Sequence, residues 1–415
     1  MLLWCVTAIA TDQVTLPELL RLGINRNPAI DAARNEWAAT IEQLPQVTAL
    51  PDPMIRFDYF LENVETRIGP QKCRYGLSQA FPYPGTLAQA GAVVEQAVRI
   101  KHTQYDRAIR DFIVDLKLSY HEITYLRGAM VITAQNQDLL NHILKIMNAR
   151  YAEGKAKLND VLKAQSQLAQ LSYDVILLRE LEQVETAKIN VLLDLPTATP
   201  LGEAALPPLE VVSLPIDEIE AAALAGRQEI EIAAGNVGKT KEEIRLAALQ
   251  NRPKFTVSTM RIATGDAAMP NVGDSGNDAW LVGVGLSLPL WREKNRSRVR
   301  QAELIHEAAL SSQRIVENQT RAAVRSVYFR LENARRLIGL YEKSLIPQAE
   351  QAMEIAEQWH GSDVKDISGF LETQGVWLNF NLARLRAATD YQQYKARLER
   401  LVGGRIPAAK TEDER

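Results

Sequence analysis

The length of one uninterrupted helical pattern limits the possible folds of this chain more than any other feature. No proline occurs between Gly85 and Leu195, so nothing in this stretch forces a helix to end. Apolar residues such as Phe112 and Leu116 recur there at helical spacing. A helix over about 86–149 would measure roughly 95 Å at 1.5 Å per residue. Because a compact domain cannot bury a helix of that length, the pattern predicts an elongated bundle.

A second helical segment follows a break near Gly154. Its apolar residues alternate by three and four, the pattern of a coiled-coil seam, and the same spacing recurs near the C-terminal end. The first seam comprises Val161, Ala164, Leu168, Leu171, Val175 and Leu178, and the second comprises Leu371, Gly375, Leu378, Leu382 and Leu385. Both patterns predict long helical hairpins, the first turning near Gly154.

The chain contains two copies of one pattern. Gly76-Leu77-Ser78 recurs as Gly285-Leu286-Ser287 at an offset of 209 residues, whereas Pro53 recurs as Pro253 at an offset of 200. The difference is an insertion of nine residues between two strand candidates. Each copy is predicted to form a helix, two strands and a long helical hairpin. The expected divisions are a signal remnant (1–10), a first repeat (11–195), a proline-rich linker (196–215), a second repeat (216–404) and a polar tail (405–415).

Four short segments alternate apolar and polar side chains, which is typical of strands with two different faces. The four segments are 55–62, 74–81, 255–263 and 280–288. The third is less regular, because its apolar parity shifts after Ser258. Alternation over about ten residues with aromatic side chains is the signature of strands in a membrane barrel. A small soluble sheet with one wet face would give the same alternation.

Four strands are too few to close a barrel, which needs about eight. Open strand edges are not tolerated in lipid. If these strands cross a membrane, several chains must therefore combine them, and three chains would supply twelve. The same three chains would join their long helices into a coaxial tube, and a closed tube of this kind conducts.

The N-terminus favours export. Residues 1–10 read MLLWCVTAIA, which is apolar and ends in the small-x-small pattern of a signal-peptide cleavage site at Ala8-Ile9-Ala10. Cys5 is an alternative lipidation site, although the bulky Trp4 before it is unfavourable. The remaining alternative is the frayed N-terminus of a cytosolic protein.

Three short runs resemble the TolC family of outer-membrane efflux proteins. Leu77 to Gly85 reads LSQAFPYPG, which is similar to the family's strand-to-helix transition. Leu345 to Glu350 reads LIPQAE, which resembles its break before the second long hairpin. Arg150 to Gly154 reads RYAEG and, with the Asp160-Val161-Leu162 that follows, looks like its first periplasmic tip. The repeat and these motifs cover nearly the whole mature chain.

The resemblance implies a mainly α fold with a small β part. Each protomer would be a tandem repeat of long helical hairpins plus four strands, trimerising into a twelve-stranded β-barrel and a twelve-helix α-barrel. It also implies an outer-membrane location with a large periplasmic part, contact with outer-membrane lipid, a periplasmic adaptor and an inner-membrane pump. The FPYPG form is similar to members that serve heavy-metal pumps of the resistance–nodulation–division type. The duct itself would be passive, without catalytic residues or cofactors.

The resemblance also assigns docking tips for the adaptor. Tyr151 and Gly154 would form the first tip, where a glycine permits a tight turn between antiparallel helices. Trp359 and Gly361 would form the second, which departs from the family pattern because the offset of 209 places Asp363 opposite Gly154. A glycine that serves only to turn the chain remains an alternative at the first tip.

Acidic residues near the tips are candidates for a charged entrance. They are Asp160, Asp363, Asp366 and Glu372. The resemblance aligns Glu372 with an acidic position at the family's periplasmic constriction. Three-fold symmetry would turn each acid into a ring that concentrates cations and repels anions. Solvated acids at helix ends are an equally good interpretation.

Other chemistry finds little support in the sequence. A formal net charge of -3 gives no electrostatic reason to expect nucleic acid. The five histidines are scattered, which argues against a helical zinc site, and Cys73 is the only thiol after the signal. No phosphate loop, nucleophile elbow or dinucleotide fingerprint occurs.

Four other interpretations remain. They are a soluble coiled-coil scaffold, a periplasmic adaptor, a TolC-like duct for protein secretion and a TolC-like duct for drug efflux. A scaffold would not need four alternating strands in duplicated positions, and an adaptor would carry one hairpin rather than two.

Overall fold

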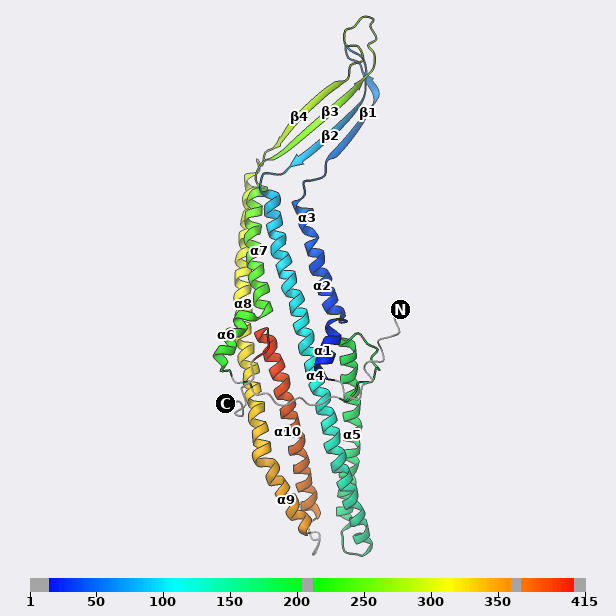
Figure 1. Cartoon of the computed structure of the whole chain (residues 1–415), viewed down its shortest axis with the longest axis vertical. Helices are drawn as coiled ribbons and strands as arrows, with labels where there is room; N and C mark the ends of the chain where they lie inside the picture. Colours follow the sequence, from blue (N-terminus) through cyan, green and yellow to red (C-terminus); the bar gives the residue numbers. More distant parts are fainter. Residues whose placement is uncertain (1–14, 204–211, 213, 360–366, 407–415) are drawn as a thin grey trace. The chain divides into compact units, whose positions relative to one another are not determined.

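The computed structural model describes residues 15–203, 212, 214–359 and 367–406. The chain is mainly α with a small antiparallel sheet, as the sequence predicts (Figure 1). The helices are α1 (Leu16–Ile24), α2 (Pro28–Ile41), α3 (Gln43–Thr48), α4 (Thr86–Ala152), α5 (Leu158–Leu192), α6 (Ile216–Gly226), α7 (Gln228–Gln250), α8 (Arg292–Leu340), α9 (Ile346–Trp359) and α10 (Ile367–Val402). The strands are β1 (Met54–Val64), β2 (Gln71–Phe81), β3 (Lys254–Thr264) and β4 (Ala279–Ser287). Within the described residues, no helix has the length and apolarity needed to cross a membrane.

The chain divides into two compact units. The first comprises the described parts of Met1–Ala33, Tyr105–Ile230 and Glu317–Arg415, and the second comprises Arg34–Gln104 and Glu231–Val316. Each unit takes segments from both halves of the sequence. The first unit is built from helices, and the second contains the sheet together with the helix segments that lead into and out of it.

The long helices are confirmed. α4 runs for 67 residues, and the predicted break at Gly154 separates it from α5. Both predicted seams contain buried residues, for example Val161 and Leu171 in α5 and Leu371 and Leu378 in α10. These four side chains belong to one apolar cluster, which also contains residues of α4. The alternation of apolar residues by three and four therefore identified the helix faces that pack together.

Two further apolar clusters hold the first unit together. One joins α1 and the end of α5 to α4 and includes Leu116, Ile123 and Leu193. The other joins α6 and α8 to α10 and includes Leu331 and Tyr391, both fully buried. The Tyr391 hydroxyl accepts a hydrogen bond of 2.8 Å from the backbone N–H of Val212, which ties the linker between the two halves to this core.

The last hairpin helix of each half ends in the same way. α5 is followed by Asp194 at φ 55°, and α10 is followed by Gly403 at φ 75°. The next residue in each case bonds back across the turn, from Leu195 N to Asn190 O at 2.8 Å and from Gly404 N to Glu399 O at 3.2 Å. A left-handed residue with this bond is the Schellman motif. The two caps lie 209 residues apart, the offset found in the sequence.

The break expected at Leu345–Glu350 takes the form of a π-helical turn, Tyr341–Leu345, between α8 and α9. Pro347 follows it and has no N–H to donate to the preceding turn. Because one wide turn re-phases the backbone bonds, the helix continues without ending. The sequence run therefore marks an irregularity inside a long helix.

The four strands form one antiparallel sheet in the order β1-β2-β3-β4 (Figure 1). Their predicted positions are confirmed, including the irregular third strand, whose Phe255 pairs with Phe81 and whose Arg261 pairs with Tyr75. The segment between β3 and β4 is longer than that between β1 and β2. The insertion inferred from the two sequence offsets is therefore located between strands.

Candidate functional site: the α4–α5 turn and the α5–α10 groove

The turn between α4 and α5 depends on Gly154. This residue has a φ of +73°, which side chains other than glycine adopt only with strain. Its N–H bonds to Tyr151 O at 2.9 Å, and the N–H of Lys155 bonds to Arg150 O at 2.8 Å. These two bonds form the same Schellman motif that ends α5 and α10. An added Cβ would meet nothing within 4 Å, so the glycine is required by the backbone and not by crowding.

The surface around this turn is exposed and mixed in character. Tyr151 is 45% exposed although it is a large aromatic side chain. Glu153 and Lys155, which flank the glycine, form an ion pair in which Lys155 Nζ lies 2.9 Å from Glu153 Oε2. The hydrogen bond from Lys155 lowers the pKa of Glu153. The turn therefore presents an exposed aromatic residue and a charge pair, with Tyr151 three residues before Gly154.

A groove runs between the start of α5 and the start of α10. It is lined on α5 by Asn159, Leu162, Lys163, Ser166 and Gln167, and on α10 by Leu371 and Glu372. Glu372 is exposed there. Asp160 lies in the first turn of α5, where its N–H bonds to Lys157 O at 3.1 Å and its carboxylate is favoured by the helix N-terminus. Glu372 thus borders the same helix turn that carries Asp160.

The second predicted tip is only partly described. Trp359 is the last residue of α9, and its backbone alone is described. Gly361, Asp363 and Asp366 lie outside the described residues.

A buried polar pair sets the register between α4 and α10 behind the groove. Gln374 is only 2% exposed, and its amide donates a hydrogen bond of 2.7 Å to Asn136 Oδ1. Both residues lie within a mainly apolar seam, where an unpaired amide would cost about 1–3 kcal/mol. Sliding one helix along the other would break this pair, so it specifies one alignment.

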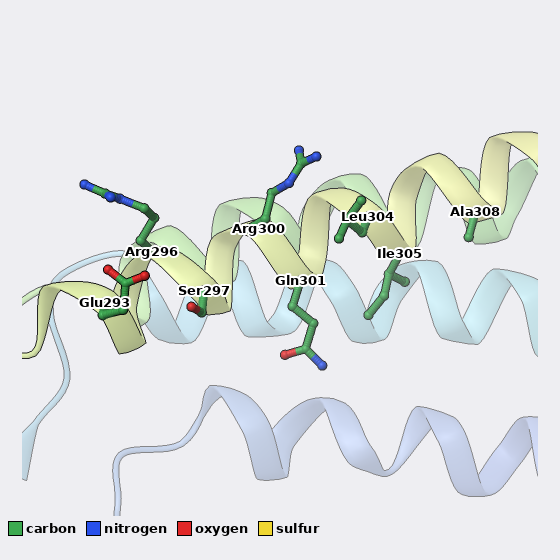
Figure 2. A pocket seen from close by; sticks show the side chains of 8 residues that line it. All are labelled: Glu293, Arg296, Ser297, Arg300, Gln301, Leu304, Ile305 and Ala308. Carbon is green, nitrogen blue, oxygen red and sulfur yellow. The ribbon is translucent and has the colours of Figure 1, made fainter.

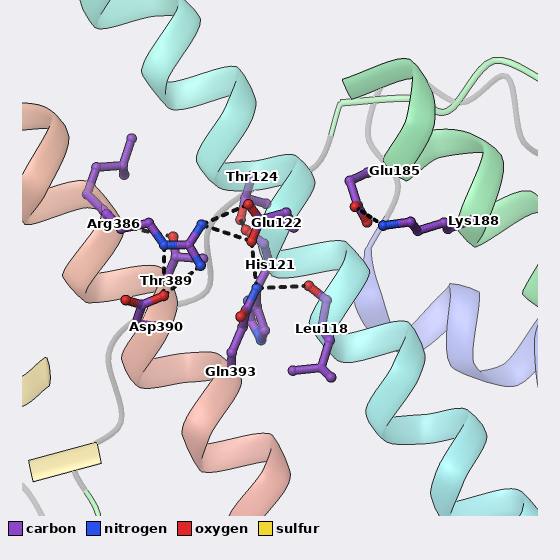
Figure 3. Close-up of polar contacts among 11 residues, drawn as sticks. Leu118, His121, Glu122, Thr124, Glu185, Lys188, Arg386, Thr389, Asp390 and Gln393 are labelled. Carbon is purple, nitrogen blue, oxygen red and sulfur yellow. Dashed lines mark hydrogen bonds and ion pairs between the residues drawn. The ribbon is translucent and has the colours of Figure 1, made fainter. Parts of the chain in front are cut away.

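A polar network connects α4 and α10 further from the turn (Figure 3). Arg386 on α10 bonds to both carboxylate oxygens of Glu122 on α4, at 2.7 and 3.0 Å, and also to Asp390. Gln393 bonds to Glu122 as well, at 2.8 Å. Burial opposes the charge of Arg386, but its hydrogen bonds to Glu122 and Asp390 outweigh burial and raise its pKa. This network escaped prediction, because nothing in the sequence indicates which charged side chains of two distant helices will meet.

No residues of the described part of the chain form a recognisable metal centre, since no three His, Cys, Asp or Glu side chains cluster suitably there. Cys73 is a free thiol on β2.

Comparison with known proteins gives one consistent result. The family model of the outer membrane efflux protein matches residues 19–191 and 221–404. The pyoverdine export outer membrane protein OpmQ of Pseudomonas aeruginosa is 23% identical over 351 residues, covering 77% of this chain and 69% of that protein.

Solved structures show the same fold. VceC of Vibrio cholerae has a TM-score of 0.78 at 17% identity and covers 94% of this chain and 97% of its own. CusC has a TM-score of 0.79 at 12% identity, with coverages of 94% and 92%. The MtrE outer membrane channel of Neisseria gonorrhoeae has a TM-score of 0.72 at 16% identity, with coverages of 95% and 91%.

The family match extends over both halves of the sequence and most of the chain. It confirms the resemblance to the TolC family and the expected location in the outer membrane. The family and the structures similar to this chain are channel proteins. This chain belongs to the outer membrane efflux protein family.

Proposed function

We propose that three copies of this chain form a passive outer-membrane duct, which receives its cargo from an inner-membrane pump through a periplasmic adaptor. Each of two repeats, residues 11–195 and 216–404, would contribute two strands and one long helical hairpin. The duct has no role as an enzyme in this proposal.

The sheet carries the main argument for assembly. One face of the sheet exposes many large apolar side chains in the single chain: Ile55, Phe57, Tyr59, Tyr75, Leu77, Trp280, Val282, Val284 and Leu286. β1 and β4 each have one edge without a partner strand in the described chain. Both the apolar face and the two open edges favour aggregation in water. Lipid would cover the face, and the β1 and β4 edges of neighbouring copies would cover each other.

The helices also expose surfaces that a second copy would cover. α5 carries an apolar stripe at helical spacing that includes Tyr173, Leu177, Leu181, Val184 and Val191, all exposed. Such a stripe predicts helix packing.

A groove follows one face of α8, and all of its lining residues come from this helix (Figure 2). Gln301 and Ile305 point to one side of the helix, whereas Arg296 and Arg300 point away from it (Figure 2). Leu304 and Ile305 are about half exposed. We assign this face, like the stripe on α5, to contact between protomers.

The ends of the hairpins would contact the adaptor and guard the entrance. We propose Tyr151, Gly154, Trp359 and Gly361 as docking residues, and Asp160, Asp363, Asp366 and Glu372 as entrance acids. The exposed aromatic ring and the tight glycine turn support the first tip. The groove beside Glu372 supports the position of the acids.

The cargo would be chosen by the pump. Export of metal cations by a pump of the resistance–nodulation–division type is supported by the FPYPG run from Phe81 to Gly85. Pyoverdine, which the related OpmQ exports, is an example of a different cargo class. A duct for protein secretion is the second candidate within this family.

The number of copies tests this proposal directly. The purified protein in detergent is expected to give the mass of three chains in native mass spectrometry, because pooling the strands removes both open edges of each sheet. Reconstituted into a planar bilayer, it should conduct ions. A stable monomer in detergent would contradict the proposed architecture.

A variant at Gly154 tests the docking tip. Gly154→Trp is expected to abolish most efflux in cells, because the indole would occupy the space at the tip where the adaptor is proposed to dock. The detergent trimer should stay intact, because an added Cβ at this position meets nothing within 4 Å in the chain itself. The backbone strain of a side chain at this φ is about 1–2 kcal/mol, so Gly154→Asn serves as the control. Asparagine tolerates left-handed backbone and is short, and its efflux should stay close to that of the parent. Unchanged efflux and adaptor cross-linking in Gly154→Trp would remove Gly154 from the docking surface.

A further inference from the structure

The two faces of the sheet differ in chemistry, and strand register assigns each residue to one of them. Residues directly opposite in an antiparallel pair point to the same face. Phe57, Tyr75 and Trp280 lie in one such row, on the apolar face. Arg56 pairs with Gly76, and Asp58 pairs with Arg74, so these residues lie on the opposite, polar face.

Small side chains line part of the polar face, and the rows of Arg56 and Arg74 continue to Met260 and Ile262 on β3. Ser78 lies opposite Ser258, which lies opposite Gly283, and Thr256 lies opposite Gly285. Short side chains leave open space along a strand. Among the regularly paired positions of β1 and β2, the charged side chains on this face are Arg56, Asp58 and Arg74. We call these three residues the strand belt.

The strand belt has more positive than negative charge. The only carboxylate in it, Asp58, accepts a hydrogen bond of 2.9 Å from Arg56 Nε. Arg74 instead bonds to the neutral Gln71 Oε1 at 3.3 Å. Its Nε is shielded from solvent and has no acceptor among the described residues. One of the two guanidinium charges is thus left without a carboxylate.

An aromatic ring holds this remaining charge in place. The guanidinium carbon of Arg74 lies 4.6 Å from the centre of the Phe60 ring, a cation–π geometry. A guanidinium stacked on a ring keeps a planar fork of donors available at its edge, which matches a carboxylate better than an ammonium does. The belt therefore combines a surplus charge with the geometry that recognises organic carboxylates.

We infer that the strand belt forms an anion-preferring ring inside the strand portion of the duct, where it binds organic carboxylates in transit. The inference rests on the proposed trimer, in which the polar faces of three sheets surround the lumen. Three copies give a surplus of three positive charges at one level. Rings of arginine favour anions in pores. The strand belt would thus have the sign opposite to that of the entrance acids, including Glu372.

Ion selectivity in planar bilayers tests the ring. The reversal potential of the parent trimer under a KCl gradient gives its chloride-to-potassium permeability ratio. Arg56→Gln combined with Arg74→Gln should lower this ratio about twofold or more at salt near 0.1 M, where the Debye length is about 10 Å. Asp58→Asn should raise the ratio, because it removes the only negative charge of the belt.

Two controls separate the belt from other charges. Arg261 lies on the apolar face, where it pairs with Asp278 and stacks over Trp280, so Arg261→Gln should leave the ratio unchanged. Glu372→Gln should raise the chloride-to-potassium permeability ratio by a similar factor in the parent and in the double arginine variant, because the entrance acid and the strand belt act independently. Each variant is first checked for the detergent trimer.

Binding is measured with citrate as the probe. Citrate should reduce the parent's current in a concentration-dependent manner, and the double arginine variant should need a several-fold higher concentration for the same block. If the parent conducts and the double variant has the same permeability ratio and the same citrate block, the inference is overturned and the proposed duct stands. A parent that opens no channel overturns both.

Discussion

Replacing Arg400 with methionine is expected to lower the free energy of unfolding by about 3 kcal/mol, because it breaks the ion pairs of a largely buried arginine and leaves Arg227 as the remaining ion-pair partner of Glu229. The Arg400 side chain is 12% exposed. It bonds to Glu229 Oε1 at 2.6 Å and to Asp111 on α4. Burial opposes its charge, but these two hydrogen bonds prevail and raise its pKa. Arg400 thus joins the last helix of the second half to α4 of the first half.

The measurement is urea unfolding of the trimer in detergent, followed by far-ultraviolet circular dichroism. Arg397→Met is the matched control, because Arg397 is exposed on the same helix and should cost less than about 0.5 kcal/mol. Equal stabilities of Arg400→Met and Arg397→Met would show that the ion pairs do not hold the two halves together.

Acidification is expected to destabilise the protein through His121. This histidine is 4% exposed, and its Nδ1 has no hydrogen-bond partner among the described residues. Burial, with smaller contributions from Lys117 and Lys395, lowers its pKa from 6.5 to about 4. Lys117 pairs with Glu399 of α10, so both lysines near the ring belong to the contact between α4 and α10.

The sign follows from the depressed pKa. The unfolded chain takes up a proton on this ring below pH 6.5, whereas the folded chain resists protonation until about pH 4. Stability therefore falls as the pH drops from 6.5 through 4, by at most about 3 kcal/mol for a shift of this size. Above pH 6.5 the histidine makes no pH-dependent contribution.

A pH series of unfolding free energies measures this contribution. His121→Gln should flatten the stability profile between pH 7 and pH 4 relative to the parent, because glutamine does not titrate. His142→Gln is the control, since His142 is exposed on the same helix and its replacement should leave the profile unchanged. Parallel profiles for the parent and His121→Gln would show that other groups cause the acid sensitivity.

The parts of the candidate site that could be predicted are those fixed by local sequence. The break at Gly154 follows from helical spacing and a glycine, whereas Tyr151 and Glu372 were singled out by the family resemblance. The second tip was harder to predict, because the copy of the repeat there lacks a glycine at the corresponding position. Its docking and entrance roles remain proposals.

The sequence by itself determined the elements of this protein. Helical length, the position of the turns and the alternation of the strands depend on neighbours a few residues apart, and such periodicity is visible in a single chain. The internal repeat adds the number and order of the elements. The family resemblance follows from the same local runs, such as LSQAFPYPG at Leu77 to Gly85.

Only the tertiary structure decided where corresponding positions of the two repeats differ in burial and in contacts. Gln165 and Gln374 occupy corresponding positions of the two repeats, yet Gln165 is exposed and Gln374 is buried against Asn136. The same holds for the charged contacts, since Arg386 and Glu122 are 264 residues apart in sequence. Burial and ion pairing depend on which face of one long helix meets which face of another, and the spacing within either helix carries no information about that partner.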